Sequence, residues 1–327
     1  MSFNKKIIIS VDTEADWFDQ KTNAVSNINS LYHLQDECDR FNIALTYLIT
    51  YEVASTESSL KILDEFNKDS KCEIGSHLHV WSTPPFQNPN KHNVDVDWYH
   101  GFQSELPDNL LDQKLSSLHN VILKNLGVRA QSHRAGRWGV DIRTLSWLEK
   151  NNYLVDSSIS SRKFWFYSKG VKEYIKINAL TSPNNPYYPS RDDIAKEGKG
   201  KNAFRILEVP VTGIPLRFLS NTQNKGLILF SVIINKLGNY NIGNISFRPS
   251  YDIGLKKFEH LIRKLFESDI QIYNFMLHSN ELAVGKSPYS KTENSRNQLL
   301  KRIQLVFRLA DEYGINGIKL SDVAALY

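Results

Sequence analysis

Two histidines separated by one residue, His77 and His79, are the pattern in this chain that points most directly to chemistry. Ile74 and Gly75 precede them and read as the end of a buried strand. Residues two apart in an extended chain point to the same face, so both imidazoles can reach one point. Neutral imidazole is a common ligand of zinc and similar metals, although two surface histidines in a loop would give the same pattern.

Carboxylates and further cations follow other apolar segments. The β-branched run at residues 6–11 predicts a strand buried on both faces, and Asp12 and Glu14 come directly after it. Arg134, Asp156 and His278 also stand at the ends of apolar segments. The carboxyl ends of parallel strands form the face where barrel enzymes gather their catalytic groups, so these side chains are expected to meet there.

The elements that must position these residues alternate along the chain. We expect strands at 6–11, 44–49, 153–156, 205–211, 270–277 and 317–320, and one that ends at His77. Helices are expected at 30–42, 108–125, 252–269 and 293–313, with two more capped by Thr56 and Asp141. Strands alternating with helices predict an α/β fold with parallel strands and helical crossovers, and this length favours an irregular barrel.

The length allows one large domain or two smaller ones, and the lack of an internal repeat or a convincing linker favours one. The 327 residues contain 40 Lys and Arg against 35 Asp and Glu, a balance too mild to indicate a nucleic-acid partner. We expect one domain with long loop insertions at about 82–107 and 160–205. The most apolar later run, 226–234, is too short to span a membrane. The two cysteines have no metal spacing, and no secretory segment is recognisable, which favours a cytoplasmic protein.

The residues expected at one rim could carry out hydrolysis. One carboxylate and two imidazoles leave at least one coordination position open on a divalent ion, as catalytic sites require. Such an ion polarises a carbonyl and acidifies a bound water. A second carboxylate could take the proton of that water, and a distant histidine could protonate the leaving group. This combination predicts cleavage of an amide or an ester.

Four segments, in order, resemble the motifs of the polysaccharide deacetylases, the NodB-homology enzymes of carbohydrate esterase family 4. They are Ser-Val-Asp-Thr-Glu (10–14), Ile-Gly-Ser-His-Leu-His (74–79), His-Arg-Ala-Gly-Arg-Trp (133–138) and Phe-Met-Leu-His (275–278). The resemblance extends from about residue 6 to 320. The His-Leu-His-x-Trp and Arg-Ala-Gly-Arg-Trp variants are similar to a subgroup linked to bacterial surface-polysaccharide genes.

The resemblance implies a single catalytic domain over residues 1–327, a deformed (β/α) barrel of seven or eight strands. It implies hydrolytic removal of an acetyl group from a sugar in surface-polysaccharide or glycolipid biosynthesis, and it favours an N-acetyl over an O-acetyl group. It also implies an N-acetylated saccharide substrate and one divalent metal ion, for which zinc is the first candidate. Carried over by position, Asp12 is the general base, Arg134 pairs with and orients it, His278 is the general acid and His77 is a metal ligand.

Two positions depart from the family pattern. Thr13 stands where the family commonly has a second, metal-binding acid, and Trp81 stands where its second histidine is usual. We expect Glu14 to replace the first, with Asp16 as the alternative, and His79 to replace the second.

Five further residues are candidates for contact with the substrate: Trp81, Arg137, Trp138, Asp156 and Glu281. The two tryptophans could stack on a sugar ring or simply pack, and Arg137 could contact substrate or brace the rim. Asp156 could orient His278 or Arg134, or cap a turn. Glu281 is expected to lie near His278.

The sequence also leaves two other classes of protein open. An amidohydrolase-type barrel acting on a non-sugar amide also uses a His-x-His pair, although normally on its first strand. A non-catalytic, glycan-binding relative without metal would explain the departures at Thr13 and Trp81. The sequence carries no signal for an oligomeric state.

Overall fold

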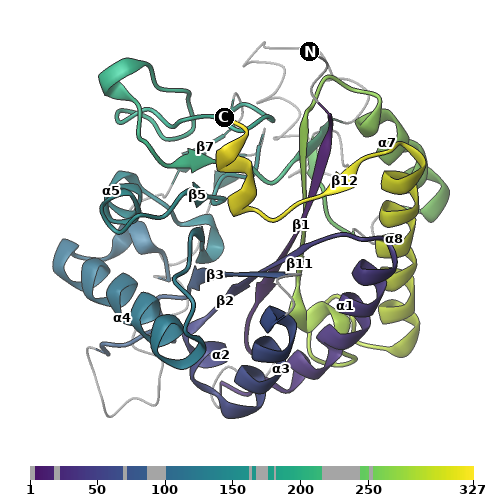
Figure 1. The fold of residues 1–327 in the computed structure, drawn as a ribbon, viewed down its shortest axis with the longest axis horizontal. Helices are drawn as coiled ribbons and strands as arrows, with labels where there is room; N and C mark the ends of the chain where they lie inside the picture. Colours follow the sequence, from purple (N-terminus) through teal and green to yellow (C-terminus); the bar gives the residue numbers. More distant parts are fainter. Residues whose placement is uncertain are drawn as a thin grey trace.

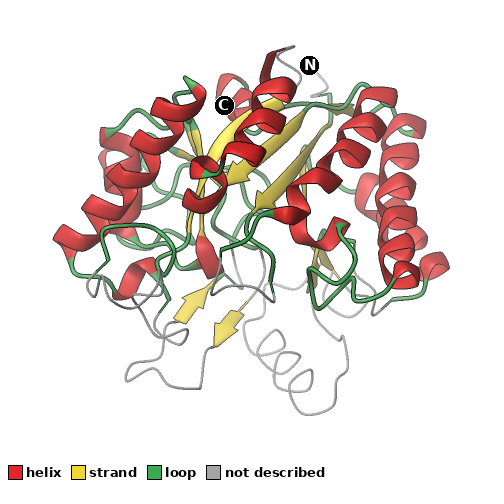
Figure 2. Cartoon of the chain, turned by 90° about the horizontal axis from the view of Figure 1, so that it is seen from below, coloured by secondary structure: helices red, strands yellow, loops and turns green. Residues whose placement is uncertain are grey.

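The computed structural model describes residues 4–17, 23–68, 72–86, 101–161, 164–166, 176–179, 182–215, 244–249 and 253–327. Its strands lie at the centre and its helices surround them (Figures 1 and 2). Segments from Lys6 to Gly317 contribute to the same sheet. The predicted α/β class is therefore confirmed.

The main sheet is parallel and has the strand order β11-β1-β2-β3-β4-β5-β8, with β12 paired to β1 beside this path. These strands are β1 (Lys6–Thr13), β2 (Leu45–Ile49), β3 (Cys72–Leu78), β4 (Ser132–Ala135), β5 (Val155–Asp156), β8 (Leu207–Glu208), β11 (Ile272–His278) and β12 (Asn316–Gly317). Seven strands on the curled path and one beside it agree with the predicted barrel of seven or eight.

Helices connect the strands and cover the outside of the curled sheet (Figure 2). They are α1 (Leu31–Arg40), α2 (Tyr51–Ser55), α3 (Glu57–Lys68), α4 (Asp108–Leu126), α5 (Ile142–Lys150), α7 (Leu255–Phe266) and α8 (Glu293–Glu312). Two predicted helix boundaries are set by residues at the helix ends themselves. Asp141 accepts a hydrogen bond from the Thr144 amide, and Gly127 ends α4 with a φ of 66°.

Side chains on the inner face of the barrel become more polar from the amino ends of the strands, here called the bottom, to their carboxyl ends, here called the top. At the bottom, Ile8 of β1 and Ile272 of β11 belong to a buried apolar cluster. Two residues further along each strand come Ser10 and Asn274, which hydrogen-bond to each other at 2.8 Å. Because side chains alternate along a strand, the same face then presents Asp12 and His278 at the carboxyl ends.

Asn274 also joins the two edges of the sheet, where β11 and β8 do not pair as strands. Its amide donates to Thr212 Oγ1 at 2.8 Å and its carbonyl accepts from the Thr212 amide at 3.3 Å. Its side-chain Nδ2 donates to the Val209 carbonyl and to Ser157 Oγ. Side-chain hydrogen bonds thus replace part of a strand ladder, which makes the barrel irregular.

The described residues of the predicted insertions contribute no strand to the main sheet. In the second, β6 (Phe164–Phe166) pairs antiparallel with β7 (Lys176–Asn178), and Tyr187 forms an antiparallel bridge with Glu208 of β8. A further antiparallel pair joins β9 (Gly213–Pro215) and β10 (Asn244–Ser246). Residues 87–100 of the first insertion and the apolar run 226–234 lie outside the described residues. None of the helices in the described part combines the length and apolar character needed to cross a bilayer.

Replacing Asn274 by leucine tests the closure of the barrel. Asn274 is fully buried, and leucine would leave Ser10, Ser157 and Val209 without these hydrogen bonds. Leaving such buried groups unsatisfied should lower the free energy of unfolding by about 2–4 kcal/mol, measured by urea denaturation. The same replacement at exposed Asn294 in α8 is the control and should change it by no more than about 0.5 kcal/mol. Equal effects at both sites would contradict this account of closure.

Candidate metal centre and active site

One cavity of ≈ 270 Å³ at the carboxyl ends of the strands is lined by the predicted metal-binding residues and by two of the three predicted catalytic residues, and the third, Arg134, is paired with Asp12. Asp12 and Glu14 come from the end of β1, His77 and His79 from the end of β3, and His278 from the end of β11. The cavity is lined, among others, by Asp12, Glu14, Asp16, Glu52, His77, His79, Trp81, Arg137, Trp138, Arg248, His278 and Tyr289. The predicted shared rim is therefore present.

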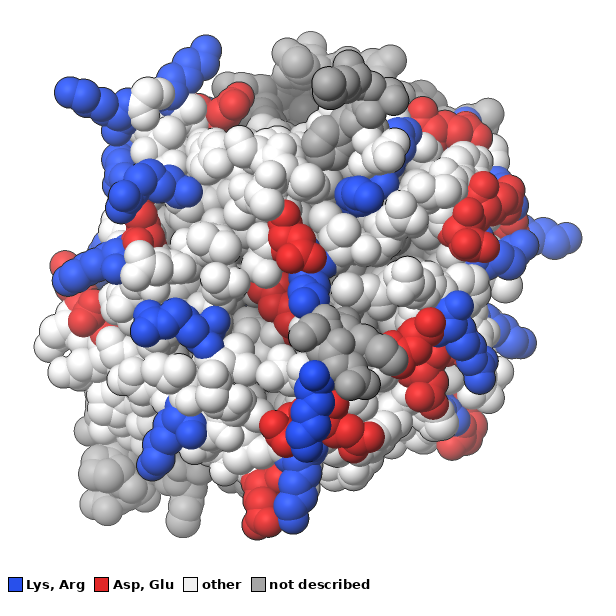
Figure 3. Space-filling view, in the orientation of Figure 1, with Lys and Arg blue, Asp and Glu red and all other residues white. Residues whose placement is uncertain are grey.

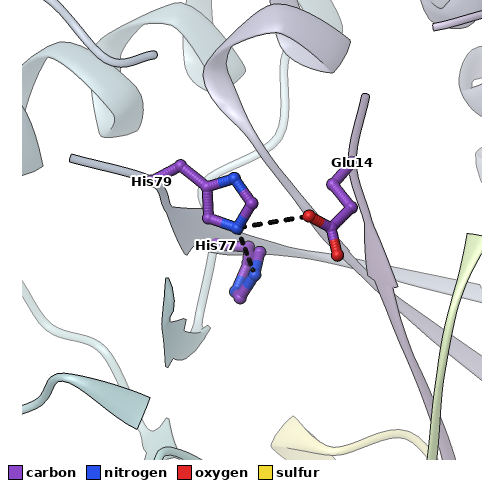
Figure 4. Close-up of side chains that lie close together, drawn as sticks. All are labelled: Glu14, His77 and His79. Atoms are coloured by element: carbon purple, nitrogen blue, oxygen red, sulfur yellow. Dashed lines mark hydrogen bonds and ion pairs between the residues drawn. The ribbon is translucent and has the colours of Figure 1, made fainter. Parts of the chain in front are cut away.

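Glu14, His77 and His79 form a buried cluster whose ligand atoms all lie within 4.8 Å of one another. His79 Nε2 lies 3.0 Å from His77 Nε2 and 3.4 Å from Glu14 Oε2, so His79 stands between the other two (Figure 4). His77 and His79 reach one point, as their spacing predicts.

The surroundings of this cluster suit a divalent cation. His77 Nδ1 donates to the Arg134 carbonyl at 2.8 Å, which leaves the lone pair of Nε2 facing the cluster. Burial lowers the pKa of His79 well below its usual value, and the charges of His77 and His278 lower it further, so its imidazole stays neutral. One carboxylate and two neutral imidazoles are a donor set that zinc accepts while keeping a position open. The residues present therefore fit one divalent ion.

Asp12 and Arg134 form a buried ion pair beside this cluster. Arg134 Nη1 donates to Asp12 Oδ1 at 2.6 Å, as predicted. Asp12 Oδ2 lies 3.9 Å from Nε2 of both His77 and His278, so the second oxygen faces the cavity. Burial alone would raise the pKa of Asp12, but the charge of Arg134, followed by those of His77 and His278, lowers it. Asp12 is thus a carboxylate at neutral pH.

His278 lies beside Asp12, its register partner on the neighbouring strand, and is held through its other nitrogen. Its Nε2 lies 3.4 Å from Glu14 Oε1, while Nδ1 lies 2.8 Å from Glu281 Oε1. Arg248 forms an ion pair with the same oxygen of Glu281. Burial alone would lower the pKa of His278, but the carboxylates of Glu14 and Glu281 outweigh it and raise the pKa. Glu281 is 1% exposed, and its described contacts are with His278 and Arg248.

Trp81, Arg137 and Trp138 all line the cavity, as predicted for residues that contact substrate. The Trp81 ring lies 4.3 Å from the ring of His79, and the Arg137 guanidinium lies 5.3 Å from the Trp81 ring centre. The guanidinium of Arg134 lies 5.7 Å from the Trp138 ring centre. The two tryptophan rings therefore pack against His79 and Arg134 from the cavity side.

Asp156 and Asp16 have other surroundings than those we expected. Asp156 is fully buried and accepts a hydrogen bond from Ser158 Oγ at 2.8 Å. It is not among the described residues that line the cavity, so the structure does not support the substrate contact predicted for it. Asp16 forms an ion pair with Lys286 at 2.9 Å and accepts from the Asn27 amide. Glu14, not Asp16, therefore accompanies the two histidines.

Sequence reasoning missed Arg248 and Glu52. Arg248 lies in the short described segment 244–249 and has no motif around it, so only its contact with Glu281 reveals it. Glu52 is the second residue of α2, the helix that follows β2 at the same rim. The strand-end rule used for the other residues could have identified Glu52. Burial raises its pKa, which favours the neutral acid.

No protein-family model matches the chain, and no curated protein matches it. Solved structures do match. A Mycobacterium smegmatis protein described as a polysaccharide deacetylase is 14% identical with a TM-score of 0.54, over 100% of this chain and 91% of the other. A Parabacteroides distasonis protein described as a glycoside hydrolase/deacetylase is 14% identical with a TM-score of 0.62, over 99% and 71%. The chain has the polysaccharide-deacetylase fold.

Another solved structure with this fold has a different described activity. It is a 4-alpha-glucanotransferase from Thermococcus litoralis, 13% identical with a TM-score of 0.53, over 99% of this chain and 40% of the other. One fold can carry unrelated reactions, so the reaction of this chain must be argued from its side chains.

Replacing Glu14 by glutamine tests the metal centre. Burial raises the pKa of Glu14 to about 8, with the charges of Asp12 and Glu52 adding to the rise and that of His278 opposing it. Zinc binding at pH 7 should therefore release about one proton, measured by calorimetry in buffers of different ionisation enthalpy, and should raise the melting temperature. Both effects should be lost in Glu14→Gln and retained in the control, exposed Glu197→Gln.

The metal-free proteins give the matching stability result. Because the folded-state pKa of Glu14 lies above its usual 4.5, metal-free wild type should lose stability as the pH rises from 4.5 toward about 8. Glutamine resembles the protonated acid and should remove this loss. Unchanged zinc affinity in Glu14→Gln would rule out Glu14 as a ligand.

Proposed function

We propose that this protein is a metal-dependent hydrolase that removes an acetyl group from a saccharide. We favour an N-acetyl group over an O-acetyl group as the one removed. The observation that carries the proposal is the meeting of the Glu14, His77 and His79 cluster with an ionised Asp12 and with His278. The polysaccharide-deacetylase fold supports it. The family resemblance adds the setting, which is bacterial surface-polysaccharide or glycolipid biosynthesis.

Each group in the cavity has a role in amide hydrolysis. A divalent ion, for which zinc is the first candidate, would be held by Glu14, His77 and His79. It would polarise the acetyl carbonyl and acidify a water. Asp12 Oδ2 faces the centre and accepts the proton of the attacking water, as a general base does. Arg134 holds the other oxygen, so Asp12 keeps one orientation and its negative charge.

His278 completes the reaction by protonating the leaving nitrogen of the sugar as the C–N bond breaks. Its proton is available because Glu281 accepts from Nδ1 and the nearby carboxylates favour the charged ring. Water supplies the hydroxyl of the acetate and one proton of the amine, so the products are acetate and an amino sugar. Trp81, Arg137 and Trp138 lie at the cavity wall, where they would contact the sugar.

The competing reactions fit the side chains less well. Glycosidic-bond cleavage uses two carboxyl groups that face the bond with no cation between them. Here Asp12 is tied to Arg134, and Glu14 shares its cluster with two imidazoles. An amidohydrolase-type site would place His-x-His at the end of its first strand, whereas here the end of β1 carries acids and the histidines stand at the end of β3. A glycan-binding protein without metal would not take up zinc, which metal analysis of the purified protein decides.

Replacing Asp12 by asparagine tests the base. Asparagine keeps the size of the side chain but cannot accept the proton of water, so kcat for acetate release should fall about 100- to 10,000-fold. Zinc content should stay at the wild-type level because Asp12 is not in the ligand cluster. The assay follows acetate released from an N-acetylated oligosaccharide, with the exposed Asp192→Asn variant as the control. Full activity in Asp12→Asn would refute the assignment.

Replacing Glu281 by glutamine tests the positioning of the acid. Glutamine can still bond to His278 but removes the charge that raises the pKa of the ring. We expect kcat to fall about tenfold with KM nearly unchanged, and the alkaline limb of the kcat profile to move to lower pH. A fall in substrate affinity alone would instead indicate that Glu281 contacts the sugar.

A further inference from the structure

Two buried carboxyl groups lie side by side behind the active-site rim. Asp156 of β5 and Glu208 of β8 are partners across parallel strands, and they are 0% and 1% exposed. Their carboxyl groups hydrogen-bond to each other. A carboxylate can only accept, so this hydrogen bond requires one proton between the two groups. Neither residue is among those that line the cavity in the described structure.

The contacts of the pair place that proton on Glu208. Both oxygens of Asp156 already accept from Ser158, Oδ1 from the hydroxyl at 2.8 Å and Oδ2 from the amide at 3.2 Å. Glu208 Oε1 accepts from the Ile159 amide at 3.0 Å, which leaves its other oxygen to carry the proton. Burial, together with the charge of Asp156, raises the pKa of Glu208 well above its usual value.

Two further titratable groups face the pair. Arg134 of β4 favours the charged form of both acids, and it is itself paired with Asp12. Tyr187 of the second insertion covers Glu208, and burial followed by the two carboxyl groups raises its pKa. Tyr187 is therefore neutral, and Arg134 supplies the positive charge on this side.

Ser158 connects the pair to the active site. Because its hydroxyl donates to Asp156, its lone pairs are free to accept from the Ala135 amide, which they do at 2.8 Å. Ala135 directly precedes the turn Gly136–Trp138. At Gly136 an added Cβ would lie 2.7 Å from Cδ2 of His79, so the turn packs directly against a predicted metal ligand.

This turn has a conformation that needs external support. Arg137 and Trp138 have φ angles of 56° and 61°, in the left-handed region that is unfavourable for residues with a side chain. Such residues persist only where their surroundings hold them. The hydrogen bond from Ala135 to Ser158 holds the chain two residues before this strained pair.

We propose that Asp156 and Glu208, sharing one proton, are positioning residues that hold the Gly136–Trp138 turn against His79 through Ser158. The inference rests on the proposed function only in that the turn serves the metal centre. Asp156 must be an acceptor at both oxygens, whereas Glu208 must be a donor at one oxygen and an acceptor at the other. The two acids therefore differ in which amide can replace them.

Matched amide variants test this asymmetry. In Glu208→Gln, the amide nitrogen can donate to Asp156 and the oxygen can accept from Ile159, so every hydrogen bond survives. In Asp156→Asn, an NH2 group replaces one of the two acceptor oxygens, so one hydrogen bond from Ser158 is lost and the serine is no longer held in place under Ala135. The readouts are the indole resonance of Trp138, assigned with Trp138→Phe, and zinc affinity by calorimetry. We expect Asp156→Asn to move the resonance and to weaken zinc binding about tenfold. Glu208→Gln should leave the resonance in place and zinc binding within about twofold.

Melting curves against pH give a result independent of zinc. Because the folded-state pKa of Glu208 is raised, wild type should lose stability as the pH rises above 4.5, and Glu208→Gln should not share this loss. Its advantage in melting temperature should thus grow with pH. Ser158→Ala, which keeps the acid pair, should move the Trp138 resonance as Asp156→Asn does, with exposed Ser146→Ala as the control. This variant keeps the test decisive if Asp156→Asn does not fold.

Three results would overturn the inference: equal damage by the two amide variants, an unmoved Trp138 resonance in both Asp156→Asn and Ser158→Ala, or no pH-dependent advantage for Glu208→Gln. If wild type binds no zinc, the proposed function fails, while the resonance and the melting curves still decide the inference.

Discussion

The buried ion pair between Arg134 and Asp12 is the interaction on which this site depends. Arg134 is fully buried, and its guanidinium also donates to Ser10 Oγ, to Ser157 Oγ and to the Ser157 carbonyl. Removing such a charge from water is costly unless every donor finds a partner. Strands β1, β4 and β5 must therefore hold one relative position, which is also the position that turns Asp12 toward the two histidines.

This arrangement follows from the layering of the barrel interior. Apolar residues such as Ile8 close the bottom, hydrogen-bonded residues such as Asn274 form the middle, and charged residues occupy the top. The dry layers below allow the upper groups to interact strongly, because water does not screen them from beneath. The same burial raises the pKa of Glu14 and makes a divalent ion the natural partner of its carboxylate.

The departures from the family pattern make physical sense in the structure. Trp81, at the usual position of the second histidine, packs its ring against that of His79. His79 reaches the cluster from two residues earlier, on the face that it shares with His77. Glu14, one position beyond Thr13, has the longer side chain needed to approach His79 from β1. One carboxylate and two imidazoles are thus brought together in spite of the two departures. On the face shown in Figure 3, positive and negative side chains are interspersed, so the described charge is concentrated at no single patch there.

The sequence by itself determined the order of the elements and the rim at which the reactive residues stand. Hydrophobic periodicity and helix caps are local, so β1, α4 and α5 lie close to where the pattern predicted them. Only the tertiary structure decided the partners. Arg134 and Asp12 are 122 positions apart, and whether they touch depends on the curvature and register of the sheet. For the same reason it was the fold that joined Glu14 rather than Asp16 to the histidines, placed Arg248 against Glu281, and moved Asp156 behind the cavity beside Glu208.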